Sequence, residues 1–168
     1  MHTTSVTVDP IIVGGGSTDT YTFNITNTGA TDSINEINIF FPMGFEFVDS
    51  LECPTNWSSY VISGGIKCVD EGGGNEIAPG DAEKVSFKAR APSPESNKIY
   101  IWEVITYDTT GAWWRNEEAK TTIDVTPPTT TASATSPPGK DPYTFGNWTN
   151  SNVEVTLTCN DNGGSGKD

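Results

Sequence analysis

Short runs in which apolar and polar residues alternate make up most of this sequence. Residues 21–26 read Tyr, Thr, Phe, Asn, Ile and Thr, and residues 84–90 alternate in the same way. An alternation of period two is typical of a β-strand with one buried face. Strands are predicted at residues 4–8, 21–26, 34–41, 46–48, 60–62, 66–69, 84–90, 98–107 and 120–125. Because Gly, Pro, Asn and Asp separate these runs, the pattern predicts an all-β fold, an antiparallel β-sandwich.

A stretch rich in proline and threonine, residues 126–131, divides the chain. Its paired prolines, Pro127 and Pro128, favour a stiff extended connector and keep a sheet from continuing. Alternation at 130–135 and 152–159 predicts the first strands of a second sandwich, which about 40 residues are too few to complete. We therefore expect one sandwich domain over residues 1–125, and a linker with a partial repeat over residues 126–168.

Acidic residues strongly outnumber basic ones. The chain has 22 Asp and Glu against 9 Lys and Arg, a net charge of −13, and 18 of these acids but only 7 of the bases lie in residues 1–125. Nucleic acid and anionic membrane would be repelled, so we exclude both as partners. No apolar run is long enough to span a membrane.

Three motifs carry a resemblance to a known family. They are Val125-Thr126-Pro127-Pro128-Thr129-Thr130-Thr131, then Trp148-Thr149 ahead of Val153–Leu157, and the run rich in Asn and Gly at 160–166. Together they resemble the tandem immunoglobulin-like repeats of bacterial and archaeal cell-surface proteins of the adhesin or S-layer type. In residues 1–125 the likeness is looser and depends on the turns at 24–29 and 77–81.

The resemblance implies an immunoglobulin-like fold, an extracellular location and a non-catalytic structural or adhesive role, as a spacer or in assembly. It brings no catalytic residue. The implied partners are other subunits or domains of a surface protein. Residues 153–157 lie in the unfinished repeat and could add to a neighbour's sheet, which favours a variant in which the chain is a filament subunit joined by strand exchange.

Two of the three cysteines are placed for a disulfide. Gly64-Gly65 lies between Cys53 and Cys68 as a hairpin turn, so the cysteines can face one another across a pair of strands. We predict a bridge between them; the alternative is two buried thiols. A bridge closing about 15 residues would stabilise the fold by roughly 3 kcal/mol in the chain-entropy model. Cys159 is left over. We expect its disulfide partner to lie beyond Asp168; the alternative is that Cys159 is a free buried thiol.

The sequence gives catalysis little support. A Ser or Cys nucleophile needs an activating base, and the one histidine, His2, is expected in a disordered N-terminus. Glu103 and Asp108 could serve a glycosidase, but the solvent face of a strand supplies acids routinely. We therefore predict that the protein is not an enzyme and requires no cofactor.

The segment Trp113-Trp114-Arg115 favours a different class of function. Adjacent residues of a strand face opposite ways, so at least one of the two indoles should approach solvent. Exposed aromatic rings stack on sugar rings, which makes Trp113, Trp114 and Arg115 a candidate carbohydrate site. The alternative function is thus a carbohydrate-binding module of a secreted hydrolase, with polysaccharide as its partner. A Trp that only covers the end of a sandwich is the non-binding alternative.

Two acidic runs are candidates for a structural calcium ion. Asp70, Glu71 and Glu76 lie in one glycine-rich run, and Asp161 lies in another. Calcium takes six to eight oxygen ligands, and neither run has the spacing of an EF-hand loop. A solvated loop is the alternative interpretation of both.

Three Asn-x-Ser/Thr sequons begin at Asn24, Asn56 and Asn147. They predict a glycoprotein, because this triplet is the acceptor for N-glycosylation in exported chains. A chain rich in Asn and Thr also produces such triplets by chance.

Overall fold

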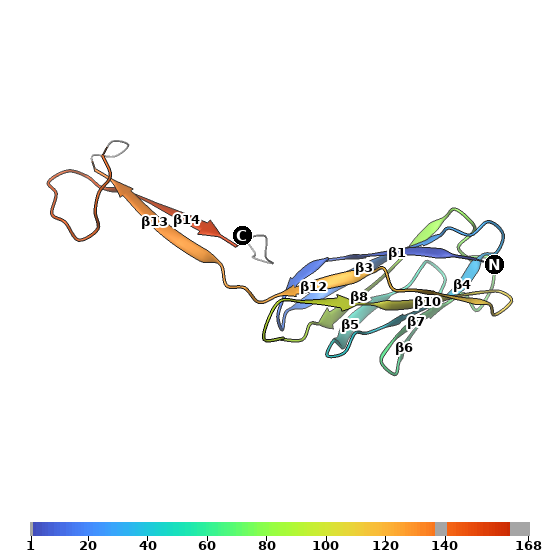
Figure 1. Cartoon of the computed structure of the whole chain (residues 1–168). Helices are drawn as coiled ribbons and strands as arrows, with labels where there is room; N and C mark the ends of the chain where they lie inside the picture. Colours follow the sequence, from blue (N-terminus) through green and yellow to red (C-terminus); the bar gives the residue numbers. More distant parts are fainter. Residues whose placement is uncertain (1, 137–140, 162–168) are drawn as a thin grey trace. The chain divides into compact units, whose positions relative to one another are not determined.

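The computed structural model describes residues 2–136 and 141–161 (Figure 1). The chain divides into two compact units, Met1–Val125 and Thr126–Asp168, and each is described by itself. The predicted all-β fold is confirmed, and none of the described residues is helical. No helix in this part of the chain is therefore long and apolar enough to cross a membrane.

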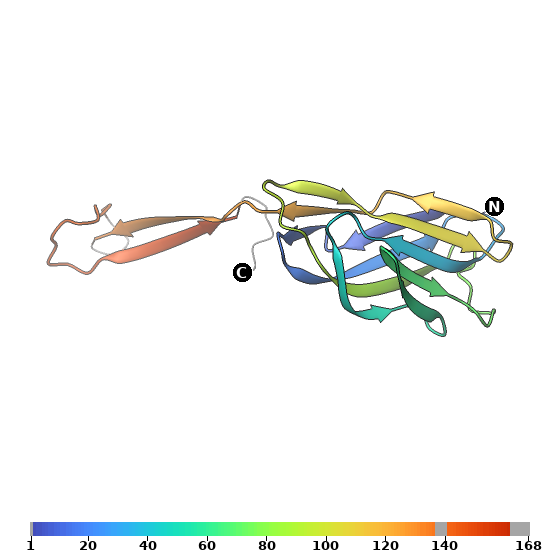
Figure 2. The same ribbon diagram turned by 90° about the horizontal axis from the view of Figure 1, so that it is seen from below.

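The first unit is built from three sheets. A four-stranded antiparallel sheet has the order β1 (Thr4–Asp9), β3 (Thr18–Asn27), β8 (Ala82–Arg90), β5 (Glu46–Glu52). A five-stranded antiparallel sheet has the order β11 (Trp113–Asn116), β10 (Glu103–Asp108), β4 (Ile34–Phe40), β7 (Gly65–Val69), β6 (Ser58–Ile62). A smaller sheet has the order β2 (Ile12–Gly14), β12 (Lys120–Asp124), β9 (Lys98–Ile101). Figures 1 and 2 show these strands packed as layers.

The core lies between the layers and is rich in aromatic rings. Trp102 is fully buried, and its ring centroid lies 4.8 Å from that of Phe45 and 5.2 Å from those of Tyr21 and Phe23. Its indole N–H donates to Thr121 Oγ1 at 3.0 Å, so the one polar atom of the ring is satisfied. Tyr21, Phe23 and Trp102 are inward members of the alternating runs, whereas Phe45 lies just before the run predicted at 46–48.

The run at 98–107 differs from the prediction of one continuous strand. It is divided at Trp102 into β9, which pairs with β12, and β10, which pairs with β4 and β11. Trp102 lies between the two strands, and its backbone N–H donates to the Ala119 carbonyl at 2.9 Å. This single alternating run therefore forms strands in two sheets. The chain passes from one sheet to the other at Trp102, whose side chain is buried in the core between them.

Two short strands were outside the prediction. β2 and β11 contain three and four residues, and their sequences, Ile-Val-Gly and Trp-Trp-Arg-Asn, do not alternate between apolar and polar residues. β2 also pairs with β12 in parallel, so the sandwich is not antiparallel throughout.

The second unit contains one antiparallel ribbon, β13 (Thr129–Thr135) and β14 (Glu154–Asn160), in the part that the structure describes. One face of the ribbon carries the pairs Thr131 with Thr158 and Ser133 with Thr156 and is polar. The other face carries Ala132 opposite Leu157, Ala134 opposite Val155, and Thr130 opposite Cys159. Val155 is 52% exposed and Leu157 is 68% exposed, so this second face, the apolar ribbon face, remains largely uncovered.

Candidate functional site

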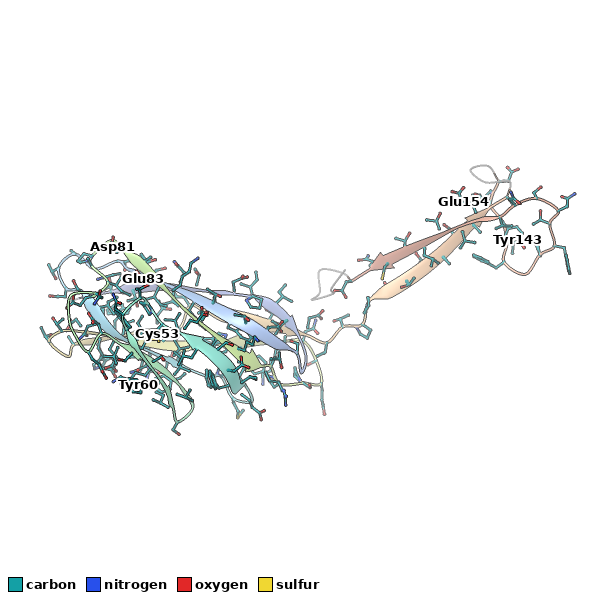
Figure 3. The ribbon with its side chains drawn as sticks, turned by 180° about the vertical axis from the view of Figure 1, so that it is seen from behind. Cys53, Tyr60, Asp81, Glu83, Tyr143 and Glu154 are labelled. Atoms are coloured by element: carbon teal, nitrogen blue, oxygen red, sulfur yellow. A yellow bond between two sulfur atoms is a disulfide. The ribbon has the colours of Figure 1, made fainter. Side chains whose placement is uncertain are left out.

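A disulfide joins Cys53 to Cys68, with their Cα atoms 5.6 Å apart. Gly64 and Gly65 do connect β6 to β7, but the two cysteines do not face each other across that hairpin as the spacing suggested. Cys68 is a buried residue of β7, whereas Cys53 directly follows β5, the edge strand of the four-stranded sheet (Figure 3). The bridge therefore holds two different sheets together.

The predicted carbohydrate residues lie on β11, the edge strand of the five-stranded sheet, and do not form one surface. Trp113 is paired with Tyr107, is 59% exposed and faces outward. Arg115 shares that outer face and forms ion pairs with Glu103 at 2.8 Å and Glu117 at 3.6 Å. Trp114 lies opposite the buried Thr106, so its half-buried ring faces the other way.

The outer face of the five-stranded sheet continues from β11 to β6 as a surface of paired polar groups. Lys67 Nζ donates to Glu36 Oε2 at 2.7 Å. At the far edge the Tyr60 hydroxyl donates to Glu71 Oε1 at 2.5 Å, and this hydrogen bond raises the Tyr60 pKa (Figure 3). The face thus carries an exposed aromatic ring on each edge strand, Trp113 on β11 and Tyr60 on β6.

The four calcium candidates are not brought together. Asp161 belongs to the second unit, while the other three lie in the loop after β7. Both Glu71 oxygens already accept hydrogen bonds, from Tyr60 and from Ser58 at 3.2 Å. Over residues 2–136 and 141–161, no three His, Cys, Asp or Glu side chains are grouped to hold a metal ion. Asp70 is distinct because it is buried, at 5% exposure.

The three sequon asparagines occupy different settings. Asn24 is half-buried in the middle of β3, between Thr7 and Lys84 of the neighbouring strands. Asn56 is an exposed turn residue with a positive φ of 68°, and its amide donates to Asn75 Oδ1 at 3.1 Å. Asn147 is exposed in the second unit. Asn56 and Asn147 therefore present their side chains to solvent more fully than Asn24 does.

His2 is not disordered, which corrects the expectation drawn from its position at the chain end. Its ring is buried at 1% exposure; Nδ1 donates to Asp108 Oδ2 at 3.2 Å, and Nε2 lies 2.9 Å from Thr106 Oγ1. Burial alone would raise the Asp108 pKa, but hydrogen bonds from Thr110, His2 and Ala112 outweigh it and hold that pKa at about 2. The N-terminal segment is therefore fastened to the end of β10.

Asp108, His2 and Thr106 are connected as in a nucleophilic triad, but their side chains are not accessible to a substrate. Thr106 is fully buried and Asp108 is 3% exposed, so no substrate can reach the hydroxyl. The packing is also close on the other side of His2, because a Cβ on Gly29 would lie 2.8 Å from the His2 Cα. The arrangement is suited to fixing the chain end and not to catalysis. No sequence signal indicated it, since His2 and Asp108 are 106 residues apart.

Cys159 is a free and exposed thiol within the described part of the second unit, which differs from the buried alternative. Its Sγ lies 3.4 Å from the hydroxyl oxygen of its partner residue Thr130, on the apolar ribbon face. Trp148 and Phe145, in the connection between the two strands of the ribbon, are also exposed, at 101% and 55%. The second unit therefore presents apolar side chains to solvent at several points.

No protein-family profile matches the sequence, and a search of curated proteins finds no match. Solved structures do match. A protein from Nocardia farcinica with an immunoglobulin-like fold has a TM-score of 0.56 and 14% identity, covering 71% of this chain and 96% of that one. A chain of a type I cohesin–dockerin complex from Clostridium thermocellum has a TM-score of 0.50 and 12% identity, covering 74% and 95%. The full-length major pilin SpaD from Corynebacterium diphtheriae has a TM-score of 0.50 and 10% identity, covering 78% of this chain and 36% of the pilin.

At these identities the likeness establishes the fold alone, and it agrees with the expectation from the sequence motifs: the chain carries an immunoglobulin-like β-sandwich.

Proposed function

We propose that this chain is a non-catalytic module of an extracellular surface protein and that it works by assembly, through the apolar ribbon face of β13 and β14. The observation that carries the proposal is that Val155 and Leu157 share one face of a two-stranded ribbon and are 52% and 68% exposed. A lone two-stranded ribbon is at best marginally stable in water. Covering this face with another β-structure would bury apolar surface and stabilise the ribbon.

Two further observations support an extracellular assembly role. The Cys53–Cys68 disulfide fits an oxidising compartment, where such bridges persist. Structural neighbours of this sandwich include a pilin and a chain from a cohesin–dockerin complex, which are a subunit and a component of protein assemblies. The proposed partner is another β-domain of the same surface, and a second copy of this chain is the first to test.

The test is analytical ultracentrifugation of the full chain over a wide concentration range. A variant carrying Val155→Glu and Leu157→Glu should remain monomeric at concentrations where the parent self-associates. The matched control is Thr156→Glu with Thr158→Glu, which adds the same charges to the polar face of the same strand. Self-association that survives the first variant, or a parent that stays monomeric throughout, argues against this mode of assembly.

Carbohydrate binding is the second candidate function, and Trp113 is the observation that favours it. Its ring is 59% exposed beside Tyr107, on a face that also carries the Arg115–Glu103 ion pair. Affinity electrophoresis in gels containing soluble polysaccharides should show retardation that Trp113→Ala removes. Trp148→Ala is the control, because Trp148 is exposed in the second unit. Equal migration of the parent and both variants in every gel would remove this function.

A further inference from the structure

The Asp70 carboxylate is buried without a compensating charge. Asp70 follows β7 and is 5% exposed. Its Oδ2 accepts the Asn75 N–H at 2.8 Å, but its Oδ1 is buried and has no hydrogen-bond partner. Among the residues that the structure describes, no Lys, Arg or His side chain forms an ion pair with it. A buried carboxylate of this kind is costly unless a positive charge lies against it.

A second orphaned oxygen belongs to the residue opposite. Glu36 of β4 pairs with Val69 of β7, and just beyond that pair the Asp70 N–H donates to the Asn35 carbonyl at 2.9 Å. Asn35 is the extra residue of a bulge in β4, because Tyr107 of β10 pairs with Glu36 while Asp108 pairs with Ile34. Asn35 Oδ1 is also buried without a partner. Two buried acceptor oxygens without a donor thus belong to residues whose backbones are hydrogen-bonded to each other.

The loop that follows Asp70 carries further oxygen groups on a glycine-rich backbone. It contains Gly72, Gly73 and Gly74, and the last two have positive φ values of 68° and 94°. Glu76 turns back over the loop, because its Oε1 lies 3.8 Å from where a Cβ on Gly73 would be. The loop is held closed by the Trp57 indole N–H, which donates to the Asn75 carbonyl at 2.9 Å.

We propose that Asp70 and Asn35 bind a hard divalent cation, Ca²⁺, at this end of the five-stranded sheet, with Glu76 and loop carbonyls as further oxygen ligands. Calcium prefers carboxylate, amide and carbonyl oxygens, which are the groups present here. The ion would supply the positive charge that is missing beside the Asp70 carboxylate, and it would hold the loop against the sheet. The site lies wholly in the first unit and does not depend on the assembly proposed for the second.

The experiment uses the full chain and Tb³⁺ luminescence, with excitation of tryptophan. Trp57 contacts the loop directly, so bound Tb³⁺ should be sensitised, and Ca²⁺ should displace it. Ca²⁺ should also raise the melting temperature above that in EDTA. Asp70→Asn and Asn35→Ala should each weaken Tb³⁺ binding by at least about tenfold. Glu71→Gln is the control, since it removes the neighbouring charge while Asp70 stays intact, and it should leave binding unchanged.

Asn35→Ala keeps the test valid if Asp70→Asn does not fold. The proposal is overturned if the parent gives no sensitised Tb³⁺ signal and melts at the same temperature in Ca²⁺ and in EDTA. It is also overturned if Tb³⁺ binds equally well to folded Asp70→Asn or Asn35→Ala. Destabilisation by Asn35→Ala without any cation effect would assign Asn35 a structural role only, which equally contradicts a cation site.

Discussion

At the scale of single residues, the buried pair of His2 and Asp108 gives the fold a dependence on pH. The Asp108 pKa is lowered from 3.8 to about 2 in the folded protein. A carboxyl group with a lowered folded-state pKa stabilises the fold above its unfolded-state pKa, and this contribution is lost as the pH falls from about 4 towards 2. A shift of this size corresponds to about 2 kcal/mol of unfolding free energy.

Asp108→Asn should therefore lower the free energy of unfolding by about 2 kcal/mol at pH 7, where the parent carboxylate is ionised and accepts from Thr110, Ala112 and His2. The variant should also lose less stability than the parent between pH 4 and pH 2. Urea unfolding at a series of pH values measures both effects. Asp81→Asn is the control, because Asp81 is exposed (Figure 3). Parallel pH profiles for the parent and Asp108→Asn would contradict this assignment.

The sequence predicted some buried residues and could not predict others. Trp102 lies within the alternating run at 98–107, in phase with Tyr100 and Val104, and it is fully buried. His2 lies before the first alternating run, and Asn35 lies within the run at 34–41 but is polar, so the pattern does not indicate what either side chain contacts. The surroundings of His2 are set by Asp108, and those of Asn35 by Asp70, and both contacts join segments that are distant in the chain. Local alternation reports which face of a strand is buried, but not which polar groups meet there.

At the scale of elements, the same limit separates strand prediction from sheet prediction. The alternation located most strands, yet it did not indicate that residues 98–107 divide between two sheets at Trp102. It also did not indicate that the cysteines connect β5 to β7 across the sandwich. Pairing between strands depends on contacts that an alternation of period two does not encode. Likewise, the spacing of two cysteines does not indicate whether their disulfide forms within one sheet or between two.

The inter-sheet bridge should matter most for β5. This strand pairs only with β8, and its register with β8 is interrupted twice, so it is the least continuously paired strand of its sheet. Replacing Cys53 and Cys68 together by Ser should lower the free energy of unfolding by about 3 kcal/mol. Amide exchange should accelerate in residues 46–52 more than in the central strand β3. Cys159→Ser should change neither measurement, whereas uniform acceleration across the sheet would contradict this role of the bridge.

At the scale of the whole molecule, charge and apolar surface are divided between the two units. The net charge is −13, and residues 1–125 hold 18 of the 22 acidic side chains against 7 basic ones. The apolar ribbon face carries Ala132, Ala134, Val155, Leu157 and Cys159 and no charged residue. Two copies that approach through their ribbons therefore gain apolar contact while their first units repel one another.

This opposition predicts the salt dependence of assembly. The Debye length falls from about 30 Å at 0.01 M salt to about 8 Å at physiological ionic strength, so added salt removes repulsion between the acidic units but leaves apolar contact intact. Self-association of the full chain, measured by sedimentation equilibrium, should therefore strengthen as NaCl is raised from low to physiological concentration. The variant with Val155→Glu and Leu157→Glu should stay monomeric in the same series. Assembly that weakens with salt would mean that ion pairs hold the copies together, and it would contradict association through the apolar ribbon face.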